Sequence, residues 1–202
     1  MLPLAESLHR QRQKEEVFQP VWDKEREGPT ERTPRQLEAQ GGRVPYVLRY
    51  SESVWEKRPS NEHGAAADLA LRGTEHSGAK VEDPNASFVV LVLPRQNDLK
   101  DATAAALAHL EARQKEQFPP TTIEPVADKS GARNGSVDVG NARGQVLKLH
   151  VKNGPTRERF VMLAVVQRAE QVVAIQAECD WKRRIAWERE IQQVLGTLRI
   201  PD

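Results

Sequence analysis

Cysteine is almost absent from this chain, since Cys179 is the only one among its 202 residues. A disulfide within the chain is therefore excluded. A domain of about 150 residues buries roughly two-thirds of its unfolded surface, so a chain of this length can fold on apolar burial alone. We expect Cys179 to be a small packed side chain, because the sequence shows no histidine or cationic partner that would make its thiol reactive.

Long apolar runs are also lacking. No stretch approaches the roughly 20 residues that a membrane-spanning helix needs. The first ten residues contain neither a basic leader nor the continuous apolar segment of an export signal. The sequence therefore predicts a cytoplasmic protein without a membrane span.

Catalytic and cofactor motifs are missing as well. The chain has no Gly-x-Ser-x-Gly elbow, and its glycines from 131 to 144 lack the Gly-Lys-Ser/Thr ending of a phosphate loop. Two Glu-His pairs, Glu62-His63 and Glu75-His76, suggest a metal site, but an intervening strand would place them up to about 40 Å apart. Zinc needs three or four converging ligands. We predict no metal and no cofactor, and the sequence leaves enzymatic activity open while favouring a protein without it.

The last third of the chain carries the clearest pattern, three strands at residues 145–152, 159–166 and 171–178. The links between them are short, and a parallel crossover needs a dozen or more residues, so these strands are predicted to be antiparallel neighbours. Residues 159–166 are apolar on both faces, which is typical of a central strand covered on both sides.

Two amphipathic helices are predicted, one over residues 99–117 and one beginning near Trp181. Asp98 or Asp101 supplies a carboxylate at the start of the first, and Asp180 is placed to cap the second. Gly196 falls where the second pattern stops. The buried stripe of the second helix has members at spacings of four, three, one and three: Trp187, Ile191, Val194, Leu195 and Leu198.

The rest of the folded region shows weaker signals. A first strand is predicted to start with residues 45–50 and to end near Trp55. A buried strand is predicted over residues 87–93. Further short strands are expected at residues 67–71, 80–84 and 122–126, with a glycine-rich hairpin loop at residues 131–144.

Residues 1–43 differ in composition from the rest, with few large apolar groups and equal numbers of acidic and basic residues. Such a segment cannot offset the entropy of ordering, so we predict a largely disordered extension and a folded domain over residues 44–202. Deletion of residues 1–43 should then leave the cooperative melt unchanged. One apolar island contains Phe18 and Trp22, and it is either a docking peptide or a cluster that packs loosely on its own domain.

Charge is unevenly distributed along the chain. Residues 44–140 carry 11 Lys and Arg against 14 Asp and Glu, whereas residues 141–201 carry 11 against 6. This basic C-terminal block is either a solvated surface or a contact for acidic partners, and binding to nucleic acid would weaken steeply with salt. The candidate partner-binding residues are an exposed Trp181, the cations beside it, the polar face of residues 145–152 and the apolar island: Trp181, Lys182, Arg183, Arg184, Lys148, His150, Lys152, Phe18 and Trp22. Core packing is the equally plausible interpretation of Trp181.

The order of elements and two segments carry a resemblance to a known family. The segments are Arg49-Tyr50-Ser51-Glu52-Ser53-Val54-Trp55 and the stretch from Trp187 to Leu198. Over residues 44–200 the chain resembles the Mog/PsbP-like superfamily, which includes the DcrB-type bacterial proteins. The resemblance implies an α+β fold, an α/β/α sandwich with a central, mainly antiparallel sheet flanked by two main helices. It also implies a binding role, since known members are mostly binding proteins.

The sequence therefore favours a non-catalytic protein-binding module, an adaptor or chaperone-like protein that receives a protein segment on the sheet or beside the C-terminal helix. The alternative is an enzyme or small-ligand binder whose site residues are dispersed along the chain. A weaker alternative is nucleic-acid binding through the basic C-terminal block.

Overall fold

The three predicted C-terminal strands form the centre of one large antiparallel sheet. The computed structural model describes residues 35–74, 86–126, 136–168 and 170–201, and residues 35–202 form one compact unit. The large sheet has eight strands, ordered β3-β4-β5-β10-β9-β8-β6, with β7 paired to β8. Its strands are β3 (Trp55–Arg58), β4 (Ala67–Gly73), β5 (Ser87–Pro94), β6 (Thr121–Pro125), β7 (Ser136–Val139), β8 (Ala142–Asn153), β9 (Arg157–Gln167) and β10 (Gln171–Asp180).

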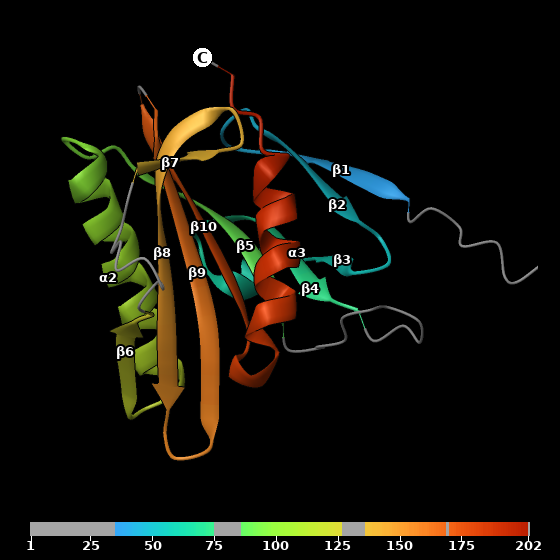
Figure 1. Ribbon diagram of the computed structural model, residues 1–202. Helices are drawn as coiled ribbons and strands as arrows, with labels where there is room; N and C mark the ends of the chain where they lie inside the picture. The colour runs from blue at the N-terminus through green and yellow to red at the C-terminus, as the bar shows by residue number, and fades with distance from the viewer. Residues whose placement is uncertain (1–34, 75–85, 127–135, 169, 202) are drawn as a thin grey trace, which may run out of the picture. The chain divides into compact units, whose positions relative to one another are not determined.

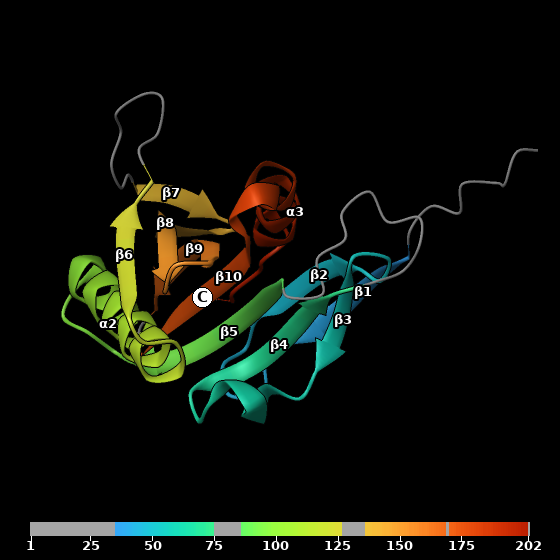
Figure 2. The same ribbon diagram turned by 90° about the horizontal axis from the view of Figure 1, so that it is seen from below.

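Each face of this sheet is covered by one helix. α2 (Leu99–Gln117) lies within the curve of the sheet, and α3 (Arg184–Gly196) lies on the other side (Figure 1 and Figure 2). Every strand pair in the described part of the sheet is antiparallel. The predicted α+β sandwich is therefore confirmed, and β9 lies in the interior of the sheet as expected.

Side-chain alternation along the strands builds two cores. On β9, Val161, Leu163 and Val165 pack in the core that contains α2, whereas Phe160 and Met162 pack in the core that contains α3. The predicted stripe of α3 is buried from Trp187 to Leu198, and Cys179 is a buried side chain in the same core. Burial of apolar surface on both faces is the main stabilising term of such a layered fold.

The helix ends agree with the capping pattern in the sequence. Asp98 Oδ1 accepts a hydrogen bond from the Asp101 amide at 2.8 Å, so Asp98 is the N-cap of α2. Asp180 Oδ1 accepts from the Lys182 amide at 2.8 Å, and a single 3-10 turn, η2 (Trp181–Arg183), precedes α3. The C-terminal helix therefore begins at Arg184, three residues after the predicted start, and it ends at Gly196.

The folded unit begins earlier than the sequence indicated. A separate two-stranded sheet pairs β1 (Gln36–Gln40) with β2 (Val47–Ser51) in five antiparallel residue pairs. β1 lies inside the segment that the composition assigned to a disordered extension, so the predicted boundary at Val44 is wrong for these residues. The predicted first strand is also divided, because a turn at residues 52–54 carries the chain from β2 in the small sheet to β3 in the large one.

Truncation should distinguish the two boundaries. Removal of residues 1–34 is expected to leave the free energy of unfolding unchanged. Removal of residues 1–43 is expected to lower it by about 1–5 kcal/mol, because each of the five lost cross-strand pairs contributes roughly 0.2–1 kcal/mol. Chemical denaturation of both truncated chains measures the difference, and equal stability of the two would contradict the role given to β1.

The predicted glycine-rich loop is partly a hairpin. β7 and β8 pair directly, and Gly140 in the turn between them has a φ of +65°, which L side chains rarely adopt. A Cβ on Gly140 would also overlap the backbone of Leu198, so the turn packs closely on the C-terminal tail. The predicted strand at residues 80–84 lies outside the described residues.

Candidate functional site

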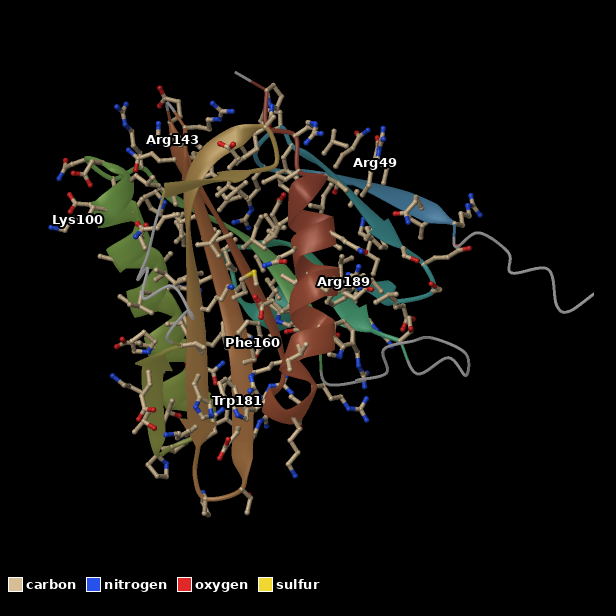
Figure 3. All side chains as sticks on the ribbon, in the orientation of Figure 1. Arg49, Lys100, Arg143, Phe160, Trp181 and Arg189 are labelled. Carbon is tan, nitrogen blue, oxygen red and sulfur yellow. The ribbon has the colours of Figure 1, made fainter. Side chains whose placement is uncertain are left out.

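The predicted partner-binding residues of the C-terminal block lie together beside the start of α3. The Trp181 ring stacks on the His150 ring, with 3.7 Å between centroids and an interplanar angle of 12°. The Arg184 guanidinium carbon lies 4.3 Å from the centroid of the Trp181 ring, and the Phe160 ring lies 6.5 Å away. Figure 3 shows Trp181 and Phe160 near the N-terminal end of α3. We call Trp181, His150, Phe160 and Arg184 the Trp181 cluster.

Trp181 is half-buried and packs against the core that contains α3, so it is neither fully exposed nor fully buried. Stacking on His150 and packing beside Phe160 cover part of the ring, because aromatic pairs gain free energy from such contacts in addition to area burial. The ring is only half-buried, and Lys182, Arg183 and Ile185, which follow it in η2 and the first turn of α3, are exposed. Ile185 is 79% exposed, and it is the exposed large apolar side chain among the described residues.

The three predicted polar residues of β8 are paired within the chain. Lys148 Nζ lies 2.7 Å from Glu188 on α3, and Lys152 Nζ lies 2.9 Å from Glu124 on β6. His150 Nε2 lies 3.0 Å from a Glu158 carboxylate oxygen on β9. The solvated face predicted for this strand is therefore half-covered by α3 and its neighbours, and its charges are largely balanced. Phe18 and Trp22 lie outside the described residues.

A second site lies on the opposite face of the sheet, beyond the C-terminal end of α2. It is a cavity of about 400 Å³ between α2, the short 3-10 helix η1 (Ser60–His63) and the ends of β3, β4, β5, β9 and β10. Two carboxylates, Glu62 and Glu178, and the His63 imidazole line it. Five guanidinium groups line the same cavity, which we call the arginine pocket: Arg58, Arg72, Arg113, Arg157 and Arg159.

The floor of the arginine pocket is a buried polar network on β9 and β10. Arg159 Nε lies 3.8 Å from a Glu178 carboxylate oxygen, and both side chains are more than nine-tenths buried. The other Glu178 oxygen accepts hydrogen bonds from Ser87 Oγ at 3.3 Å and Gln176 Nε2 at 3.4 Å. Buried charges need such paired arrangements, because an isolated ion in a low-dielectric interior is very costly.

The wall of the pocket is built from the end of α2 and the loop after β3. Arg113 Nη2 lies 3.1 Å from His63 Nδ1, which joins α2 to η1. Arg157 lies over the Phe118 ring, with its guanidinium carbon 3.9 Å from the ring centroid, a favourable cation–π arrangement. Burial lowers the pKa of His63, and the charge of Arg113 lowers it further, whereas Glu178 and Glu62 act in the opposite direction.

The lowered pKa of His63 predicts a pH dependence of stability. Folded His63 binds a proton less readily than unfolded His63, so acid favours the unfolded chain as the pH falls below the ordinary histidine pKa of about 6.5. The melting temperature is expected to fall between neutral and mildly acidic pH, and less so in His63→Gln, which retains an acceptor for Arg113. Thermal melts across this range test the expectation, with His109→Gln as the matched histidine control. An equal fall in wild type and His63→Gln would contradict it.

Sequence reasoning did not find the arginine pocket, because its cations lie on three strands and one helix. One signal was available: Gln176 and Glu178 occupy alternate positions on one face of an otherwise apolar strand, and both are buried. Within the described ranges no three His, Cys, Asp or Glu side chains converge as metal ligands would, and Glu75 and His76 lie outside those ranges. No helix among the described residues is both long and apolar enough to cross a membrane.

Comparisons with known proteins show what this architecture resembles. The chain matches no protein-family model and no curated protein by sequence. Its structure is similar to cyanobacterial PsbP (CyanoP) from Synechocystis sp. PCC 6803, with a TM-score of 0.62 and 12% identity over 86% of this chain and 96% of that one.

Two further solved structures match over similar lengths. LpqN, involved in cell envelope biogenesis of Mycobacterium tuberculosis, has a TM-score of 0.55 and 14% identity over 84% of this chain and 92% of its own. The Saccharomyces cerevisiae Ran-binding protein Mog1p has a TM-score of 0.54 and 11% identity over 84% of this chain and 97% of its own. Identities this low establish the fold alone. The chain has a Mog/PsbP-like fold, as the sequence resemblance implied.

Proposed function

We propose that the protein is a non-catalytic protein-binding module, an adaptor or chaperone-like protein. Its contact surface is the Trp181 cluster together with the exposed residues Lys182, Arg183 and Ile185. The observation that carries the proposal is the exposed Ile185 side chain in the first turn of α3, four residues after a half-buried tryptophan that an arginine covers.

Such a combination is favourable for binding a protein segment. Tryptophan and arginine are enriched among residues that contribute most to protein–protein binding, and an apolar side chain beside them gains free energy when a partner removes it from water. Lys182 and Arg183 add two exposed positive charges to the same helix start. The expected partner segment therefore combines an apolar side chain with acidic residues.

The structural neighbours agree with this role without assigning a partner. Yeast Mog1p is a Ran-binding protein, so this fold supports binding to another protein in at least one case. Fold similarity by itself does not transfer function, and the proposal depends on the chemistry of the surface beside α3. Phe18 and Trp22 remain part of the proposal as a second candidate contact.

Affinity capture of the full chain, tagged at its C-terminus, tests the proposal. A specific protein should co-purify with the wild type and be lost with Ile185→Glu and with Lys182→Glu. Lys100→Glu is the matched control, because Lys100 is an exposed lysine at the start of α2. A partner retained by both the Ile185→Glu and the Lys182→Glu variants would contradict this surface as the contact. Recovery of nucleic acid in a salt-sensitive manner would favour the nucleic-acid alternative.

The same capture with a chain that lacks residues 1–34 tests the apolar island. Loss of the partner from this shorter chain would place the contact at Phe18 and Trp22. Retention would confine the contact to residues 35–202.

A further inference from the structure

Guanidinium groups outnumber carboxylates in and beside the arginine pocket. Five guanidinium groups and two carboxylates line it, and a third carboxylate, Glu56, lies 2.9 Å from Arg58 Nη2. The lowered pKa of His63 keeps its imidazole neutral at pH 7. Glu178 is held in the network with Arg159, Ser87 and Gln176, so its negative charge lies at the floor of the cavity. The pocket therefore holds an excess of cationic groups in a partly buried space, where a charge is screened less than at the surface.

Several buried donors in the pocket lack an acceptor. Arg113 Nε and Nη1 and Arg58 Nε are buried and have no hydrogen-bond partner within the described part of the chain. The bond from Arg113 Nη2 goes to the neutral imidazole of His63, which brings no negative charge. A buried donor without an acceptor costs free energy, and a ligand oxygen would remove that cost.

We propose that the arginine pocket binds a small molecule that carries at least two negatively charged oxygen groups, phosphate or carboxylate. Guanidinium groups suit this ligand because their planar donors bind carboxylate and phosphate oxygens in pairs. A cavity of about 400 Å³ lies within the usual size range of small-molecule sites. The pocket and the Trp181 cluster lie on opposite faces of the sheet, so this site does not rest on the proposed protein-binding surface.

Calorimetric titration of the full chain tests the site, in a buffer that contains neither phosphate nor carboxylate. Inorganic phosphate and succinate are titrated separately. Saturable binding at one site is expected for at least one of them, and it should weaken as salt is added. Binding of phosphate alone identifies a phosphate group and binding of succinate alone a dicarboxylate. Failure of both anions to bind at millimolar concentration would overturn the proposal.

Two variants locate the binding. Arg113→Gln and Arg157→Gln should each weaken the affinity on the order of tenfold, the loss expected for one charged hydrogen bond. Arg157 is exposed at the rim of the pocket, so its variant keeps the test valid if Arg113→Gln fails to fold. Circular dichroism and thermal melts without ligand check the fold of each variant.

The matched control is Arg189→Gln, which removes the same charge from the exposed face of α3 on the other side of the sheet. This variant should bind the anion as the wild type does. Equal weakening in Arg189→Gln would mean that the chain attracts anions through its overall charge, and the pocket would be rejected as a site. Ile185→Glu should also leave anion binding intact, which separates this proposal from the protein-binding surface.

Discussion

Replacement of Trp187 by alanine is expected to lower the free energy of unfolding by about 3–5 kcal/mol. Trp187 is fully buried, and its ring meets the Trp55 ring at 4.9 Å between centroids in an edge-to-face arrangement. Trp55 makes a second edge-to-face contact with Phe88 at 5.9 Å. The substitution removes the ring that joins α3 to the sheet and leaves a cavity that these rigid neighbours fill only partly.

Urea or guanidinium denaturation followed by circular dichroism measures this loss. Arg189→Ala is the matched control on the same helix, and its stability should stay within about 0.5 kcal/mol of wild type because the side chain is exposed. A loss below about 1 kcal/mol for Trp187→Ala would show that the core between α3 and the sheet is not packed as described.

Replacement of Glu178 by alanine is expected to cost a similar amount, about 3–5 kcal/mol, by a different mechanism. The substitution leaves the buried Arg159 guanidinium with one neighbouring negative charge fewer, and it removes the acceptor of the Ser87 and Gln176 donors. Removal of one partner from a buried pair costs more free energy than the intact pair contributes, because the remaining charge or donor stays away from water without its partner.

An exposed ion pair provides the comparison for Glu178. Glu38 lies 3.3 Å from Arg49, and the two side chains are 44% and 65% exposed. Glu38→Ala should therefore change stability by less than about 1 kcal/mol. Equal costs for Glu178→Ala and Glu38→Ala in the same denaturation experiment would contradict the buried network at the floor of the arginine pocket.

The parts of the fold that the sequence predicted are those in which local pattern and tertiary packing agree. Residues 99–117 carry a capping aspartate and a helical stripe, and they form α2 over the same range. Residues 159–166 are apolar at every position but the first, which is a pattern that only an interior strand can bury on both sides. Short links between strands limited the topology to neighbouring antiparallel pairs.

The failures have a common physical cause, which is that contacts between elements outweigh local composition. β1 contains only Leu37 and Ala39 as apolar residues, and it is a strand because β2 offers it a complete set of backbone partners. Trp181 is half-buried because the register of β8 places His150 beneath its ring. His150 is far from Trp181 in sequence, and the mostly polar residues of β1 give no strand signal although β2 follows after a short connection.

The arginine pocket shows the same limit for function. Arg58, Arg113 and Arg157 lie far apart along the chain, and only the order of strands in the sheet and the length of α2 bring them to one cavity. The sequence placed the candidate site in the C-terminal basic block because those cations are neighbours in sequence. The structure adds a second site on the other face.

Hydrogen–deuterium exchange of the full chain, alone and with its captured partner, tests the protein-binding surface most directly. Binding at the Trp181 cluster predicts slower exchange at the start of α3 and in the adjoining part of β8, with α2 unchanged. Protection confined to α2 and η1, or unchanged exchange throughout residues 35–202, would contradict that surface as the site where the protein binds its partner.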